Sequence, residues 1–158
     1  MKQVMQRSAA DNAYMHKDFH GALSTGLIYL EQRYGADAVR EYLWQFATSF
    51  YAPLTEDVKQ RGLVALKEHF ERIYQLEGGE FTIMMSPDAM TLQVEACPAV
   101  MHIRKIGQTV APLFNETTRT VNEAICAGTP YIAELLAYDN ETGRSTVRFF
   151  RRQLRRPQ

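Results

Sequence analysis

A cysteine followed by a proline is the pair in this chain with the clearest chemical potential. Pro98 is a favoured first residue of a helix, so we expect the Cys97 thiol to lie at a helix N-terminus. The free N–H groups and the helix dipole there stabilise a thiolate and lower the pKa of a cysteine. His102 follows one turn into that helix as a candidate base, and Arg104 as a nearby cation. The alternative is a buried structural cysteine, because free cysteine is among the most buried residue types.

Two histidines with helical spacing form a second candidate site. His16 and His20 are four residues apart, which places both imidazoles on one helix face, as a metal site requires. A further ligand would have to come from elsewhere, with His69 and His102 as candidates. The pair falls on an apolar stripe, so the alternative is two core-edge histidines bonded to the backbone or to a tyrosine. We expect no metal and no cofactor.

A later predicted helix combines hydroxyl and charged residues. Thr117 and Thr118 interrupt its apolar stripe, where they could line a polar pocket or bond back to carbonyls of their own helix. Glu116, Arg119 and Glu123 lie on the opposite side with the spacing of ordinary surface ion pairs. The threonines and Arg119 are therefore candidate substrate contacts, and the acidic residues are expected to be solvated.

The periodicity of apolar residues predicts the elements that position these side chains. It is helical over the first half of the chain, and then alternates with a period of two after Gly79. The chain is therefore expected to form an α+β fold, a four-stranded antiparallel sheet of two hairpins packed with about five helices. Helices are expected over residues 16–34, 36–51, 55–76, 98–106 and 110–127, and strands over 81–85, 91–96, 131–138 and 145–150.

Bulk properties narrow the class of protein. The chain has 158 residues, a formal net charge of zero and only two cysteines, which fits one domain with reduced thiols in a cytoplasm. The balanced charge does not favour a nucleic-acid partner, and no apolar run approaches the roughly 20 residues of a spanning helix, so no membrane partner is expected. We expect a mobile arm over residues 1–14, one domain over 15–152 and a basic tail over 153–158.

The second predicted helix is apolar on more than one side. Val39, Leu43 and Phe46 share one face, whereas Trp44 and Tyr51 lie on another. A helix with two apolar faces is either sandwiched or part of an interface. We therefore expect a homo-oligomer.

A short motif suggests a family. The segment Leu92-x-Val94-x-x-Cys97-Pro98, followed by two helices and a closing hairpin, resembles the L-2-amino-thiazoline-4-carboxylic acid hydrolase-like family over about two fifths of the chain. The resemblance implies cysteine chemistry at Cys97 on a C–N bond. Members carry further cysteines downstream, where this chain has only Cys126. A second resemblance is to small-molecule sensor domains of the 4-vinyl reductase type.

These observations leave three functions open. The first is a small-molecule hydrolase acting on a C–N bond of a small carboxylate or amide. The second is a non-catalytic small-molecule-binding or sensor domain, and the third is an oligomeric scaffold. The hydrolase would use Cys97 and His102 as catalytic residues, with Arg104, Thr117, Thr118 and Arg119 at the substrate.

Elemental analysis of the purified protein tests the metal expectation. We predict no stoichiometric transition metal, because His16 and His20 lie on an apolar face and no third ligand is adjacent in sequence. About one zinc, manganese or iron per chain that is lost in His16→Ala or His20→Ala would contradict the prediction and locate the site.

Overall fold

The computed structural model describes residues 17–153. The arm expected over residues 1–14 and nearly all of the tail expected over 153–158 therefore lie outside the described residues. The helices are α1 (Asp18–Tyr34), α2 (Ala36–Phe50), α3 (Ala52–Arg61), α4 (Leu63–Glu77), α5 (Pro98–Lys105) and α6 (Glu116–Cys126), and the strands are β1 (Phe81–Met85), β2 (Ala89–Val94), β3 (Tyr131–Tyr138) and β4 (Ser145–Arg151).

The four strands form one antiparallel sheet in the order β1-β2-β4-β3. β1 pairs with β2 in the first hairpin and β3 pairs with β4 in the second. β2 also pairs with β4, which joins the two hairpins. The register aligns Leu92 on β2 with Ile83 on β1 and Val147 on β4, and Val147 with Leu135 on β3. An apolar row thus crosses the whole sheet, because residues in register on neighbouring strands point to the same face.

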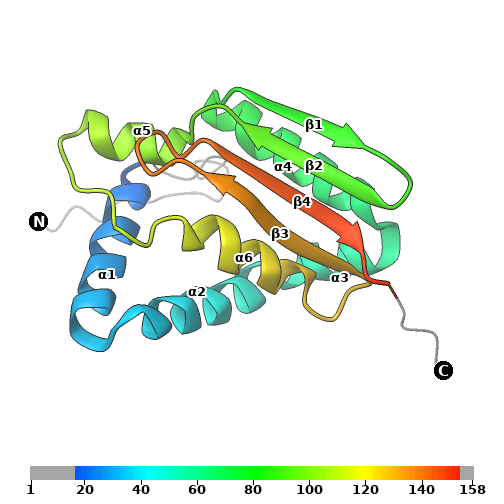
Figure 1. The fold of residues 1–158 in the computed structure, drawn as a ribbon, viewed down its shortest axis with the longest axis horizontal. Coiled ribbons are helices and arrows are strands. Elements are labelled where there is room, and N and C mark those ends of the chain that lie inside the picture. The colour runs from blue at the N-terminus through cyan, green and yellow to red at the C-terminus, as the bar shows by residue number, and fades with distance from the viewer. Residues whose placement is uncertain (1–16, 154–158) are drawn as a thin grey trace, which may run out of the picture.

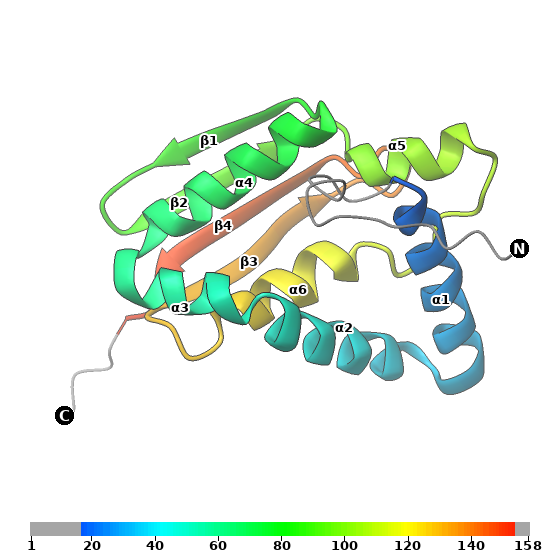
Figure 2. The same ribbon diagram turned by 180° about the vertical axis from the view of Figure 1, so that it is seen from behind.

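The helices lie on one side of the sheet (Figure 1), and α3 and α4 stand in front of the strands when the molecule is seen from behind (Figure 2). α6 packs along β3, α2 packs against α6, and α1 contacts both α2 and α5. The core between these layers contains the fully buried side chains of Leu27, Leu66 and Phe149. This arrangement confirms the α+β class and the four-stranded sheet of two hairpins expected from the sequence.

The single helix predicted over residues 55–76 is wrong, because the chain forms two helices there, α3 and α4. Gly62 separates α3 from α4 with a left-handed φ of 69°, and the Tyr131 hydroxyl occupies the space that a Cβ at this position would need. The helix expected from Val110 begins only at Glu116. Pro112 disfavours helical geometry at the preceding residue, so a turn forms there instead.

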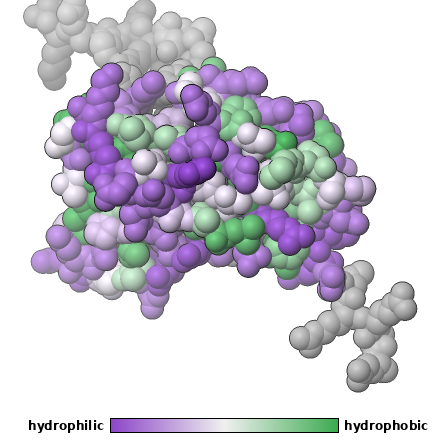
Figure 3. All heavy atoms as spheres, turned by 45° about the horizontal axis from the view of Figure 1, so that its top comes forward, coloured by the Kyte–Doolittle hydropathy of each residue, from purple (hydrophilic) through white to green (hydrophobic). Residues whose placement is uncertain are grey.

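The surface of the described residues mixes polar and apolar groups. With the top of Figure 1 brought forward, hydrophobic residues lie among hydrophilic ones rather than in one continuous patch (Figure 3). No helix within residues 17–153 has both the length and the apolar character needed to cross a membrane.

Two glycines provide a test of the packing at the start of α5. Gly143 has a left-handed φ of 68°, and a Cβ there would overlap Cys97 and Val100. Gly107 has a similar φ of 73°, but a Cβ there would meet nothing within 4 Å. Gly107→Ala should lower the free energy of unfolding by about 1–2 kcal/mol, and Gly143→Ala by about 2–4 kcal/mol. Urea denaturation measures both, and equal losses would contradict the tight packing at Cys97.

Candidate functional site

Cys97 lies where the sequence places it, at the N-terminus of α5. It is the N-cap residue of this helix and has extended backbone geometry. Its N–H donates a hydrogen bond of 2.9 Å to the carbonyl of Thr142, and Gly143 packs against its Cβ. The turn between β3 and β4 therefore covers the thiol, and Cys97 is half-buried.

The electrostatic surroundings of Cys97 oppose a thiolate. Burial raises the pKa of the thiol above its ordinary value, and the carboxylate of Glu77 raises it further. The N–H groups of Val100 and Ala99 act in the opposite direction, but the side chain of Cys97 makes no capping hydrogen bond at the start of α5. The expected lowering of the pKa is therefore wrong, because loss of water around the sulfur outweighs the helix N-terminus.

His102 has another partner in place of Cys97. Its Nε2 lies 3.3 Å from Oδ1 of Asp18 at the start of α1. Five residues of helix turn a side chain by about 140° from its starting direction, so the imidazole points toward α1 and away from the turn that covers the thiol. A Cys–His pair of the kind that activates a nucleophile is not formed between these two residues.

Arg104 fastens α5 to the same turn. Its guanidinium donates hydrogen bonds of 2.7 Å to the carbonyl of Glu141 and 3.1 Å to the carbonyl of Asn140. The Glu141 carboxylate lies 3.6 Å away. These contacts hold the β3–β4 turn over Cys97, which is a structural use of the residue predicted as a substrate contact.

Thr117 on α6 makes one of the two contacts that the sequence left open. The Thr117 hydroxyl donates a hydrogen bond of 2.6 Å to the carbonyl of Phe114, so it bonds back to its own chain. Thr117 and Thr118 are both half-buried. Together with Arg119 they lie on α6, which packs along β3, whereas Cys97 lies at the start of α5. Their substrate roles stay predictions.

Of the two acidic residues on α6, Glu123 is exposed as expected, but Glu116 is not solvated. Glu116 is only 1% exposed. Its carboxylate accepts hydrogen bonds from Arg40 on α2 (3.1 Å), from Thr120 (2.7 Å) and from Arg119 (3.4 Å). A buried carboxylate needs such partners, and its loss leaves buried donors unpaired. Glu116 therefore joins α6 to α2, and Arg40 is the partner that helical spacing could not find.

A second buried ionisable pair joins α1 to α4. Nε2 of His20 lies 3.0 Å from Oε1 of Glu77, with the two side chains 14% and 10% exposed. His20 thus faces inward, as its place on an apolar stripe predicted, but its partner is 57 residues away in sequence. His16 lies outside the described residues. Within residues 17–153, no three histidine, cysteine or acidic side chains are grouped so that they could hold a metal ion.

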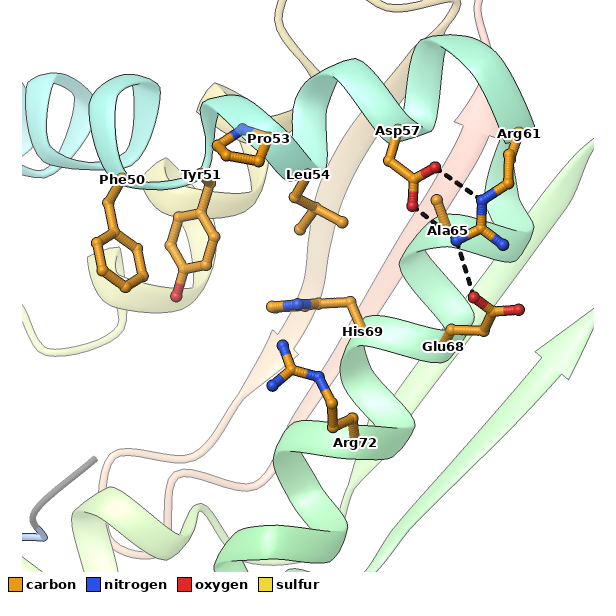
Figure 4. Close-up of a pocket in the computed structure, with 10 residues that line it drawn as sticks. All are labelled: Phe50, Tyr51, Pro53, Leu54, Asp57, Arg61, Ala65, Glu68, His69 and Arg72. Carbon is orange, nitrogen blue, oxygen red and sulfur yellow. Dashed lines mark hydrogen bonds and ion pairs between the residues drawn. The ribbon is translucent and has the colours of Figure 1, made fainter. Parts of the chain in front are cut away.

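A groove of about 480 Å³ opens between the C-terminal end of α2 and the two helices α3 and α4. Figure 4 shows its side chains, which come from α2, from α3 and from one face of α4. One wall is apolar or aromatic and the other end is charged. The lining residues are Phe50, Tyr51, Pro53, Leu54, Asp57, Arg61, Ala65, Glu68, His69 and Arg72.

One arginine closes the charged end of the groove. Arg61 on α3 donates hydrogen bonds of 2.7 and 2.6 Å to the carboxylate of Asp57, and one of 2.8 Å to Glu68 on α4. Glu68 precedes Arg72 by four residues, the spacing of a favourable helix ion pair. Because Glu68 binds Arg61 instead, no ion pair or hydrogen bond of Arg72 forms within the described chain.

His69 lies at the centre of the groove, with its ring beside the Arg72 guanidinium (Figure 4). Burial, reinforced by the charge of Arg72, lowers the pKa of His69 to about 4. Its ring meets that of Tyr51 edge-on, with centroids 5.7 Å apart. The imidazole is therefore neutral at neutral pH and offers one N–H donor and one nitrogen acceptor.

None of the six residues predicted as catalytic or substrate-binding lines this groove, although His69, named as a candidate metal ligand, lies in it. No family model matches the chain, and no curated protein matches it. The resemblance to the thiazoline-carboxylate hydrolase-like family therefore stays a prediction. The described residues define an α+β fold with a partly aromatic groove at α3 and α4.

Alkylation of the cysteines tests the neutral state of the Cys97 thiol. Burial of Cys97 predicts slow reaction with iodoacetamide at pH 7, with the rate still rising above the free-thiol pKa of about 8.5. Cys126, which is 2% exposed and whose pKa burial raises to about 12, should react more slowly still. Mass spectrometry of the two peptides gives both rates. A Cys97 rate that levels off below pH 8 would show a stabilised thiolate and restore the nucleophile.

Proposed function

We propose that this protein is a non-catalytic binding module for a small carboxylate with an aromatic or apolar body, held in the groove between α3 and α4. The observation that carries the proposal is the position of Arg72, a cation beside a neutral imidazole and an aromatic wall. A pocket with an apolar lining and a few polar groups is the usual form of a small-molecule site. The module would act as a sensor of this ligand if binding changes the packing of α3 on α4.

Arg72 supplies the recognition of charge. Asp57 and Glu68 are both engaged by Arg61, so neither of these groove carboxylates satisfies Arg72. A guanidinium without a carboxylate partner binds a ligand carboxylate by charge-assisted, often bidentate, hydrogen bonds. The neutral His69 next to it can donate one further hydrogen bond without adding a second positive charge.

The aromatic wall supplies the recognition of shape. Phe50 is 63% exposed at the edge of the groove, and its ring meets that of Tyr51 edge-on at 5.0 Å. Leu54 and Pro53 on α3 continue this wall. A flat aromatic or aliphatic body that covers Phe50 would remove an exposed ring from water, which is favourable by about 25 cal/mol per Å² of apolar surface.

The alternatives from the sequence have less support. The hydrolase needs an activated thiol, whereas burial raises the pKa of Cys97 and His102 is bonded to Asp18. The homo-oligomer rested on Trp44 and Tyr51. Trp44 is 41% exposed, but Tyr51 packs within the groove. Both functions stay predictions.

Binding of 2-naphthoate and its neutral analogue 2-naphthamide tests the proposal. Calorimetry should show that the wild-type protein binds the carboxylate more tightly than the amide. Arg72→Gln should weaken naphthoate binding by about tenfold or more, the value of a charge-assisted hydrogen bond, and leave the amide unchanged. Chemical-shift changes should centre on Tyr51 and His69.

Arg33→Gln is the matched control, because Arg33 is an exposed arginine in the last turn of α1, away from the groove. It removes the same charge and should leave naphthoate binding unchanged. Equal affinity for acid and amide, an equal loss in Arg33→Gln, or shifts that centre on another surface would each contradict the proposal.

A further inference from the structure

The two edges of the sheet are protected to different degrees. The β3 edge carries a bulge between Leu135 and Ala137, a charged residue at Glu134, and α6 packed along the strand. β1 has five residues, Phe81–Met85, with no charge, no proline and no bulge in its pairing with β2. No element of the described chain lies beyond β1 (Figures 1 and 2). Bulges, charges and prolines are the usual defences of an edge against another strand.

The backbone N–H and C=O groups of successive residues in β1 point alternately toward β2 and away from the sheet. The N–H of Glu95 bonds to the carbonyl of Glu80, and the N–H of Ser86 bonds to the carbonyl of Ala89. In an antiparallel pair the hydrogen-bonded positions alternate, and the register between these two bonds is unbroken. The backbone groups of even-numbered residues in β1 therefore face β2. Those of Phe81, Ile83 and Met85 face outward, away from the sheet.

We infer that a second copy of this chain pairs with β1, antiparallel and about a two-fold axis at Ile83. With this axis, Ile83 lies directly opposite Ile83 of the second copy, and the two residues exchange both backbone hydrogen bonds. This pairing uses the N–H and carbonyl of Ile83 that point outward from the sheet. Phe81 then faces Met85, and Thr82 faces Met84. No charged residue opposes another within the pair, and the exposed Met84 (50%) and Met85 (41%) each gain a cross-strand neighbour.

α4 supplies the rest of the contact. Two five-residue strands alone bury far less than the roughly 1,200 Å² of a stable interface. The ring of Tyr74 on α4 packs on that of Phe81, with centroids 5.5 Å apart. Lys67 and Glu71 share that face of α4 by helical spacing and form an ion pair of 2.8 Å. The two-fold axis sets the two α4 helices antiparallel, and each copy presents both signs of charge.

Light scattering coupled to size exclusion tests the inference on the full chain. The wild-type protein should have the mass of two chains, and Thr82→Lys/Met84→Lys should raise the dissociation constant of the dimer at least tenfold. The double change places like charges directly opposite each other across the two-fold axis. Leu136→Lys/Ala137→Lys is the matched control, since it adds the same charge at two exposed positions on β3 and should leave the dimer intact.

Amide hydrogen exchange on the wild-type protein gives a readout that does not depend on a variant folding. In the dimer the amides of Phe81, Ile83 and Met85 should be protected like those of Thr82 and Met84. In a chain without a partner, only the even-numbered amides are protected. A monomer at 100 µM, fast exchange at Ile83, or a dimer that persists in folded Thr82→Lys/Met84→Lys would overturn the inference.

Discussion

Desolvation of ionisable side chains is the constraint on which the rest of this structure depends. Burial raises the pKa values of Cys97, Tyr74 and Tyr138, and lowers that of His69, so it disfavours the charged form of each group. The buried carboxylates of Glu77 and Glu116 are each held by a basic partner. The raised pKa of Cys97 disfavours an activated nucleophile at that position.

The same constraint bears on the groove at α3 and α4, where we propose that a ligand binds. The left-handed Gly62 folds α4 back on α3, and Arg61 then reaches Glu68 across the two helices. That ion pair takes from Arg72 the partner that helical spacing would otherwise give it. A cation is thus left in a groove whose other wall is apolar, and the neutral His69 does not repel it.

Most of the fold could be predicted from the sequence, but little of the groove could, and particular residues show why. Alternation along Phe81–Met85 and the helix stop at Gly78 are local signals, and both were read correctly. The α3–α4 turn was missed because the apolar stripe continues through Gly62, and the groove depends on that turn. Cys97 was placed correctly at a helix start, but Gly143 and Glu77, which determine its environment, are distant in sequence.

Titration of the His69 imidazole by NMR measures directly whether burial holds the groove histidine in its neutral form. The midpoint for His69 should lie near pH 4, because its charged form loses water and meets the charge of Arg72. The folded state then binds fewer protons than the unfolded chain below about pH 6.5, so stability should also fall as the pH drops from there toward 4. A His69 midpoint near 6.5, the ordinary value for histidine, would show that burial does not disfavour the charged imidazole.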